Sequence, residues 1–382
     1  MRTILYIQYT NPSGYPPLEH SSLLLADHGW RVRHLGIAAH GAAQAITLPK
    51  HPLITVALMS APVGGWRTAV HYARFLAWCR AEVIRSRPDV VYCSDIRSYP
   101  VGLWASRKAG IMTVLHEHDP PPPARGGSAM QVLHRVRTSF AQHASLIVIP
   151  QEERAKSFLF DTGSDPGRLR VVFNCPSRRE FVALPLPPHK DRQGLTLWYH
   201  GVLGSGQIPT TVVEALAYLP RDVSIELAGY ETVGSIGYVA KLQARAVALG
   251  VADRLRVHGV LQFRSDLLRT ASRADVGLAL FASEFRDPMV GASNKPFDYL
   301  TCGLPFLTNR TPEWERFFGA EGVSVGCDPE DTNDIAREVL ALRADPARRK
   351  RMTTSGRRLI ETRWNYETQF APVLEALENG VR

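Results

Sequence analysis

The sequence predicts an α/β protein built from two Rossmann-like domains. The chain has 382 residues, of which 45% are hydrophobic, and this length exceeds one ordinary hydrophobic core. Short apolar runs alternate with helical patterns throughout, which is typical of parallel βα units. A proline-rich stretch, Pro176–Gly194, separates the two halves and has the composition of a linker.

In the first half, the expected strands are short apolar runs followed by polar or proline-rich loops. They are Ile4–Tyr9, Trp30–Leu35, Asp89–Cys93, Met112–His116 and Leu146–Pro150. Helices are expected at Ser21–His28, which Gly29 closes, and at Tyr99–Ala109. We therefore expect an N-terminal domain over residues 1–185.

The second half repeats the same rhythm. Its expected strands are Leu195–Tyr199, Ser224–Ala228, Leu255–His258, Val276–Leu280 and Pro305–Leu307. Helical patterns cover residues 332–342 and 347–382. We expect a second domain over residues 186–363 and a terminal helix over residues 364–382. Ligands of doubly wound sheets bind beyond the carboxyl ends of the strands, so we expect a central cleft between the domains.

Cysteine usage and hydropathy favour a cytoplasmic protein. The five cysteines are odd in number, scattered and without a Cys-x-x-Cys pair, which argues against a disulfide framework and a zinc site. No apolar run approaches the roughly 20 residues that span a bilayer. The apolar run after Met1 is too short for a signal peptide and is better explained as a buried first strand.

Charge is distributed unevenly along the chain. Residues 1–185 contain 21 Lys and Arg against 12 Asp and Glu, whereas the remainder contains 24 of each. This excess suggests an anionic partner or an anionic membrane surface for the first domain, so the protein could be peripheral to the membrane. The alternative is an arginine-rich surface in water. The basic residues are dispersed and form no motif, so nucleic acid is not an expected partner.

The most informative segment is Ser293–Pro305, which reads SNKPFDYLTCGLP. Pro296 suits the first turn of a helix, and Gly303 followed by Pro305 suits its end. The start of such a helix presents free N–H groups and a positive dipole end, which bind anions. Lys295 adds a full positive charge there. The alternative is an ordinary capped helix with solvated Lys295 and Asp298.

Several stretches, taken in order, resemble retaining glycosyltransferases of the GT-B fold, in particular family 4 and the related family 1/4 group. In the second half these are Tyr199–Leu203, Glu226–Gly229, Val257–Leu261, Ala274–Leu278 and Ser293–Pro305. In the first half, Leu25–Trp30, Pro150–Ala155 and Val172–Pro176 match more weakly. The resemblance thus covers nearly the whole chain, and its specificity comes from the joint order of the stretches.

The resemblance implies an activity of the hexosyltransferase type. The N-terminal domain would bind the acceptor, the second domain would bind a nucleotide-diphosphate sugar, and the terminal helix would cross back onto the first domain. The sugar would move with retention to a hydroxyl of a small-molecule, glycan or lipid-linked acceptor. No metal and no cofactor are expected, and the nucleotide sugar is a co-substrate.

The resemblance also implies site residues. The donor-binding set is Gly201, Gly229, Ser293, Asn294, Lys295 and Asp298, with Lys295 at the diphosphate and Asp298 accepting hydrogen bonds from ribose hydroxyls. Many relatives carry Arg and Lys where this chain has Val202 and Gln207, so two diphosphate-binding cations are missing. Arg286 is a candidate replacement, and Glu284 and Asp287 are weak candidates for the acid that usually precedes the motif.

In the first domain, the loop His116–Asp119 follows an expected strand. The resemblance places His118 near the hydroxyls of the donor sugar, with Asp119 and the flexible-loop residue Gly14 as further sugar or acceptor contacts. A purely structural loop and a metal site are the alternatives for His116–Asp119, and a plain turn glycine is the alternative for Gly14. His118 and Lys295 are the expected catalytic residues, acting by positioning and charge stabilisation. No catalytic base is assigned, because retaining enzymes of this kind show no agreed protein nucleophile.

Other function classes remain open at this point. A nucleotide-sugar epimerase of the same fold would need acid/base pairs, for which His116–Asp119 is the only candidate cluster. A non-catalytic sugar-nucleotide-binding relative is favoured somewhat by Val202 and Gln207. A nicotinamide dehydrogenase is disfavoured, because no Gly-x-Gly-x-x-Gly follows the first strand.

Overall fold

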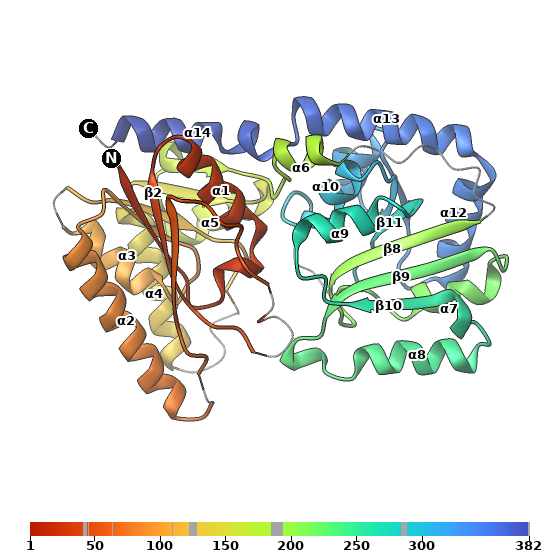
Figure 1. Cartoon of the computed structure of the whole chain (residues 1–382), viewed down its shortest axis with the longest axis horizontal. Coiled ribbons are helices and arrows are strands. Elements are labelled where there is room, and N and C mark those ends of the chain that lie inside the picture. Colours follow the sequence, from red (N-terminus) through yellow and green to blue (C-terminus); the bar gives the residue numbers. More distant parts are fainter. Residues whose placement is uncertain are drawn as a thin grey trace. The chain divides into compact units, whose positions relative to one another are not determined.

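The computed structural model describes residues 1–382 except 41–43, 45, 63, 109, 122–127, 185–193, 284–288 and 381–382. The chain forms two compact units (Figure 1). Unit 1 contains Met1–Asn174 together with Tyr366–Arg382, and unit 2 contains Cys175–Asn365. Each unit is built on its own parallel sheet.

Unit 1 contains a seven-stranded sheet in the order β3-β2-β1-β4-β5-β6-β7, and every neighbouring pair is parallel. The strands are β1 Thr3–Ile7, β2 Arg31–Ile37, β3 Ile54–Met59, β4 Val90–Cys93, β5 Met112–His116, β6 Leu146–Ile149 and β7 Leu169–Val171. The helices are α1 Pro16–Asp27, α2 Arg67–Ser86, α3 Tyr99–Ser106, α4 Ser128–His143, α5 Glu152–Thr162 and α14 Tyr366–Gly380.

Helices cover both faces of this sheet, so the strands are apolar on both sides. On one face, side chains of α2, α3, α4 and α5 form a core that includes Phe75, Tyr99, Phe140 and Phe158. On the other face, α1 and α14 form a second core (Figure 1). Its members include Leu18, Leu25, Phe370, Val373 and Leu377. The C-terminal helix α14 is thus part of the unit that contains the N-terminus.

The end of unit 2 lies two residues beyond the predicted boundary at 363/364. Trp364 is fully buried, stacks on Phe317 at 5.2 Å between ring centroids, and meets Phe297 edge-on at 5.7 Å. The side-chain amide of Asn365 donates to the Ile360 carbonyl. These contacts fasten both residues to unit 2.

Unit 2 contains a six-stranded parallel sheet in the order β10-β9-β8-β11-β12-β13. Its strands are β8 Leu195–Val202, β9 Val223–Tyr230, β10 Leu255–Gly259, β11 Val276–Ala279, β12 Phe306–Asn309 and β13 Ser324–Cys327. Its helices are α6 Arg178–Ala183, α7 Thr211–Glu214, α8 Tyr238–Ala248, α9 Arg264–Ala271, α10 Asn294–Thr301, α11 Pro312–Trp314, α12 Thr332–Ala344 and α13 Pro346–Thr362.

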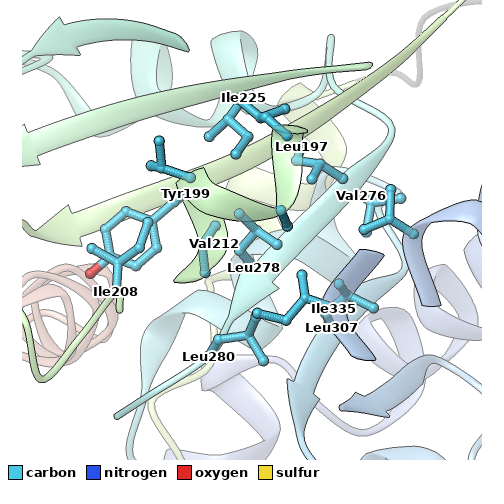
Figure 2. Close-up of a cluster of buried hydrophobic side chains, with 14 of the residues drawn as sticks. Leu197, Tyr199, Ile208, Val212, Ile225, Val276, Leu278, Leu280, Leu307 and Ile335 are labelled. Atoms are coloured by element: carbon cyan, nitrogen blue, oxygen red, sulfur yellow. The ribbon is translucent and has the colours of Figure 1, made fainter. Parts of the chain in front are cut away.

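Alternation along β8 separates an apolar face of this sheet from a polar one. Leu197 and Tyr199 point into a core with Ile225, Leu278 and Ile335 (Figure 2). Leu195 belongs to the same core. Trp198 and His200, which follow Leu197 and Tyr199 in the chain, face the other way because successive strand residues alternate. The polar face of β8 becomes important for the site.

The start of unit 2 lies before the predicted boundary at 185/186. Part of the predicted linker forms helix α6, which begins with a capping box between Ser177 and Glu180. Glu180 also pairs with Arg264 of α9. Because α6 is capped and pairs with α9, it is an integral part of unit 2, although its proline-rich surroundings resemble a linker. Residues 185–193 of the predicted linker lie outside the described residues.

Several elements differ from the sequence-based expectation. Strand β3 was not predicted, because it lies at the edge of the sheet and its residues are only partly buried. Helix α1 begins at Pro16, earlier than predicted, since proline suits the first helical turn. The short edge strands β7 and β13 were also missed.

Two findings concern the chain as a whole. Across the described residues, no helix combines the length and the apolarity that a membrane crossing requires. All five cysteines are buried and carry free thiols.

Gly277 provides a test of packing in unit 2. A Cβ atom at this position of β11 would lie 2.4 Å from the ring of Tyr299, which is fully buried and donates to the Leu278 carbonyl. We expect Gly277→Ala to lower the free energy of unfolding by about 1–3 kcal/mol, because the ring has no room to move. Gly234→Ala is the matched control, since nothing lies within 4 Å of its Cβ. Equal unfolding midpoints in denaturant for the two variants would contradict this account.

Candidate active site

The carboxyl ends of β8 and β9 approach closely at two glycines. Gly201 and Gly229 are paired in register and have φ angles of 124° and 144°. A Cβ at Gly229 would lie 1.8 Å from the Gly201 carbonyl oxygen, so only glycine fits there. β8 lies between β9 and β11, which is the position where strand order reverses and where ligands bind in such sheets.

Lys295 lies at this strand-order reversal. Its Nζ is 5.1 Å from the ring centroids of both Tyr199, on β8, and Phe281, which follows β11. Its Cε packs across Gly201, 3.1 Å from where a Cβ would be. Two aromatic faces therefore hold the ammonium by cation–π attraction, and the absence of a side chain at Gly201 gives it room.

The charge of Lys295 is not neutralised by an ion pair within the described part of the chain. Burial lowers the pKa of Lys295 to about 8, and the nearby charge of Asp298 opposes this only in part. A half-buried ammonium with a depressed pKa and no paired carboxylate is a site where an anion would be stabilised.

The N-terminus of α10 adds to this positive region. Ser293 is the N-cap residue and its side chain makes no capping hydrogen bond. The Oδ1 of Asn294 is buried and has no hydrogen-bond partner among the described atoms. The first N–H groups of a helix have no carbonyl partner within it, and they form the positive end of its dipole. The structure thus brings Gly201, Gly229 and the Ser293–Lys295 segment together.

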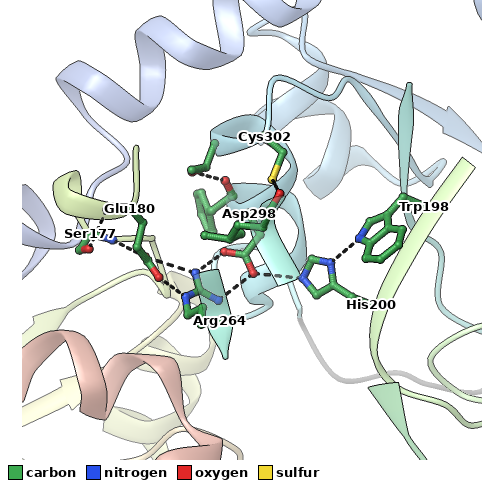
Figure 3. Close-up of polar contacts among 10 residues, drawn as sticks. Ser177, Glu180, Trp198, His200, Arg264, Asp298 and Cys302 are labelled. Carbon is green, nitrogen blue, oxygen red and sulfur yellow. Dashed lines mark hydrogen bonds and ion pairs between the residues drawn. The ribbon is translucent and has the colours of Figure 1, made fainter. Parts of the chain in front are cut away.

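Asp298 lies one turn further along α10, where other protein groups surround its carboxylate. The side chain is 1% exposed. Arg264 donates two hydrogen bonds to it, of 2.5 Å and 3.1 Å, and His200 Nε2 lies 3.1 Å from Oδ2 (Figure 3). Burial alone would raise the pKa of Asp298, but Arg264 and His200 outweigh it and the pKa lies below its usual value.

The tautomer of His200 follows from its neighbours. Trp198 Nε1 can only donate, and it donates to His200 Nδ1 at 3.0 Å (Figure 3). The proton of neutral His200 is therefore on Nε2, which donates to Asp298. Burial lowers the pKa of His200 below its usual value even though the bond to Asp298 raises it. Protonation would also break the bond from Trp198.

Arg264 extends this network to α6. Its Nε donates to Glu180 Oε1 and its Nη2 lies 3.4 Å from Glu180 Oε2. We call the set Trp198, His200, Asp298, Arg264 and Glu180 the Asp298 network (Figure 3). Because the network encloses the carboxylate of Asp298, the predicted contact with ribose hydroxyls does not fit this arrangement. The structure instead makes Asp298 the anchor of α10.

Neither Val202, the last residue of β8, nor the loop that follows it up to Gln207 provides a cation. The Val202 carbonyl accepts a hydrogen bond from Tyr199 Oη at 2.5 Å, and the side chain of Gln207 packs at Gly204. The proposed replacement Arg286, with Glu284 and Asp287, lies outside the described residues.

In unit 1, His116 is the last residue of β5, and the rest of the predicted His116–Asp119 loop follows it. Tyr92 Oη is 2.8 Å from His116 Nδ1, and the rings of His116 and His118 are 3.8 Å apart. Both ring nitrogens of His118 are buried and lack a hydrogen-bond partner among the described atoms. Burial, with a contribution from Arg154, lowers the pKa of His118 to about 3, so this side chain is neutral near pH 7.

The acids of this loop have separate partners. Glu117 forms a buried two-bond pair with Arg137, whereas Asp119 is exposed and lies 3.8 Å from Arg154 Nη1. Among the residues that the structure describes, no cluster of three or more His, Cys, Asp or Glu side chains could hold a metal ion. Gly14 ends a short 3-10 turn, and a Cβ there would meet nothing within 4 Å, so sterics do not require glycine.

Sequence reasoning missed the partners of these side chains. Trp198 and His200 are two positions apart on β8 and therefore lie on the same face of the strand. This spacing could have indicated a polar face. Arg264 belongs to no motif. In unit 1, Arg154 donates to the His118 carbonyl at 2.8 Å; it lies within Pro150–Ala155, which was assigned only to the resemblance.

The pH dependence of unit 2 tests the assignment of His200. The folded state holds His200 neutral, so below about pH 6.5 the unfolded state binds a proton that the folded state excludes, and stability falls. His200→Gln can still accept from Trp198 and donate to Asp298 but does not titrate. We expect this variant to lose less stability between about pH 7 and pH 5 than the parent.

Hydrogen exchange of β8 and α10 amides measures this effect in unit 2 alone, apart from the buried histidines of unit 1. The control is His28→Gln, because His28 is exposed and lies in unit 1. Identical pH slopes for His200→Gln and the parent would show that His200 is not held neutral.

Sequence-family models match both halves of the chain. A model described as "Glycosyl transferase 4-like domain" matches residues 20–175, and one described as "Glycosyl transferase-like" matches residues 216–375. No curated protein matches the chain by sequence.

Solved glycosyltransferase structures share the fold over the whole chain. HepE from Anabaena, solved with UDP, is 18% identical with a TM-score of 0.73, and the match covers 99% of this chain and 100% of HepE. Sucrose-phosphate synthase from Thermosynechococcus elongatus is 15% identical with a TM-score of 0.74, covering 99% of each chain. WaaG, a glycosyltransferase involved in lipopolysaccharide biosynthesis, is 15% identical with a TM-score of 0.65, covering 98% of each. Two domain models that match in sequence and a shared fold lead to one conclusion: the chain belongs to the glycosyltransferases of the GT-B fold.

Proposed function

We propose that the protein transfers a sugar from a nucleotide-diphosphate sugar to an acceptor hydroxyl, with retention and without a metal ion. The observation that supports this most directly is the ammonium of Lys295, held over Gly201 at the start of α10 and unpaired among the described residues. The leaving group of such a donor is a diphosphate, whose charge grows as the sugar departs. A cation and a helix N-terminus stabilise that charge.

The stabilisation that Lys295 can give to the leaving diphosphate is large enough to affect the rate of transfer. A hydrogen bond to a charged group contributes roughly 1.5–3 kcal/mol, which is about one to two powers of ten in rate if it strengthens in the transition state. Since Val202 and Gln207 provide no charge, Lys295 and the backbone N–H groups of α10 take a larger share. The HepE structures contain UDP or UDP-glucose, so uridine-diphosphate sugars are the first donors to test.

We assign His118 a contact with a hydroxyl of the donor sugar. Its two buried ring nitrogens lack partners among the described atoms, and an unsatisfied buried polar atom costs about 1–3 kcal/mol. A sugar hydroxyl can both donate and accept, so it suits a neutral imidazole. Asp119 and Gly14 remain proposed acceptor or sugar contacts.

The proposed step needs no protein base and no cofactor. The bond between the sugar and the diphosphate breaks, the acceptor oxygen bonds to the same face of the sugar, and the acceptor proton passes to the departing phosphate. Lys295 and α10 hold the phosphate charge, which is why we propose that no metal ion takes part. The acceptor is a small molecule, a glycan or a lipid-linked hydroxyl compound.

One alternative has specific support. The cations missing at Val202 and Gln207 favour a relative that binds a sugar nucleotide without turning it over. An epimerase is less well supported, since its candidate acid Glu117 is already paired with Arg137 and burial keeps His118 neutral.

A donor panel tests the proposed transfer. We expect free nucleotide to be released at least about tenfold faster when an acceptor hydroxyl is present, with no loss of rate in EDTA, and NMR of the product should show the donor's anomeric configuration. If free nucleotide is released at the same rate with and without an acceptor, the protein is a hydrolase or an epimerase. If the donor binds tightly and no nucleotide is released, the protein is a binding protein. An inverted product would refute retention.

Lys295→Ala tests the diphosphate site. We expect UDP to bind roughly ten- to hundredfold more weakly by calorimetry, because a charged hydrogen bond is lost. The parent should also bind UDP more weakly as the pH rises through about 8, where Lys295 loses its proton, and this dependence should vanish in the variant. Lys241→Ala is the matched control, since Lys241 is exposed in the same unit and its Nζ lies 5.9 Å from the Tyr238 ring. Unchanged affinity in Lys295→Ala would remove the proposal's main support.

A further inference from the structure

Helix α2 has a second apolar stripe that faces solvent. Its buried side contributes Phe75, Cys79 and Val83 to the core of unit 1. On the opposite side the exposed residues include Trp66, Val70 and Ile84, which are 76%, 42% and 63% exposed. The other members of the stripe are three exposed alanines, Ala73, Ala77 and Ala81.

These six residues share one side of the helix. They follow each other at intervals of three or four residues from position 66 to position 84, which is the spacing of a single helical face. Trp66 caps the helix with helical dihedral angles, so it continues the same face. Within unit 1 the fold does not use this stripe, because the sheet is already covered by the opposite side of α2.

Arginines flank the stripe. Arg67, Arg74 and Arg85 lie along one border and Arg80 along the other, as helical spacing requires, and all four are exposed. The only acid in α2 is Glu82, which is buried and bound by Arg33 at 3.1 Å and Arg85 at 2.6 Å. Every unpaired charge on the exposed side of α2 is therefore positive.

The neighbouring helices α3 and α4 lack acidic residues. α3 packs beside α2, and α4 packs beside α3 (Figure 1). Trp104 of α3 lies between Arg80 and Lys108, whose charged groups are 5.8 Å and 5.4 Å from its ring, and Val132 on α4 is 53% exposed.

We propose that the exposed side of α2 docks on an anionic lipid surface. A helix with an apolar stripe bordered by arginines lies in a membrane interface, where the stripe enters the headgroup region and the arginines meet lipid phosphates. Tryptophan, here Trp66, favours that boundary. The charge of the surface decides the partner, since it complements anionic headgroups. This inference assigns a location and does not depend on the transfer reaction, so it can fail or hold independently of the proposed function.

Vesicle flotation of the full chain tests the proposal. The parent should float with phosphatidylcholine vesicles that contain phosphatidylglycerol, should float much less with phosphatidylcholine alone, and should be released by high salt. Trp66→Ser combined with Ile84→Ser should weaken binding at least about tenfold, and Arg74→Glu combined with Arg80→Glu should do the same. Phe160→Ser and Ile236→Ser are matched controls, because these side chains are 91% and 77% exposed outside the stripe, and they should bind like the parent.

The thermal midpoints of all variants should equal that of the parent, since the altered side chains are exposed. If the double variants unfold, quenching of tryptophan fluorescence by brominated lipid, compared between the parent and Trp66→Phe, supplies the same test. The proposal is overturned if the parent ignores anionic vesicles, as it would if the stripe binds an acidic protein. It is also overturned if stripe and control variants bind alike, or if binding is equal on neutral and anionic vesicles.

Discussion

The buried carboxylate of Asp298 is the constraint on which the arrangement of unit 2 depends. An uncompensated charge at 1% exposure would be severely destabilising, so Asp298 requires Arg264 and His200, and Arg264 in turn requires Glu180 to complete its pairing. These partners come from α9, β8 and α6. Asp298 thereby fixes α10 to three elements, and Lys295, one turn earlier on the same helix, is positioned with it.

The glycine pair explains why Lys295 can occupy this position. Gly229 allows β9 to approach the Gly201 carbonyl, and Gly201 leaves space for the Lys295 side chain. Tyr199 and Phe281 supply aromatic faces on either side of the strand-order reversal. A side chain at Gly201 would displace the Lys295 ammonium, and one at Gly229 would separate the strands. The position of the charge therefore depends on both glycines.

The sequence was informative wherever a pattern is local. Alternating strands and helices predicted both sheets, and the Ser293–Pro305 segment was correctly placed at the start of a helix. The role of Asp298 was not predictable, because its partner Arg264 lies 34 positions away and belongs to no motif. α6 has the surroundings of a linker in the sequence, and only its capping box and the pair between Glu180 and Arg264 distinguish it from one. The basic excess of the first half is visible in the composition, whereas the stripe on α2 becomes apparent only once the helix is known to span Arg67–Ser86.

Arg264 and Lys295, two cations of unit 2 near α10, show how the surroundings of a charge indicate its role. Arg264 has two carboxylate partners, Glu180 and Asp298, and these acids raise its pKa further despite burial, so its charge is permanent and already used. Lys295 has no such partner among the described residues, and its pKa falls to about 8. A compact ammonium whose charge responds to its surroundings suits a ligand that arrives and leaves, whereas a planar guanidinium suits a fixed two-acid pair. Charge balance therefore supports the proposed roles: the neutralised Arg264 stabilises the fold, and we propose that the unbalanced Lys295 binds an anion.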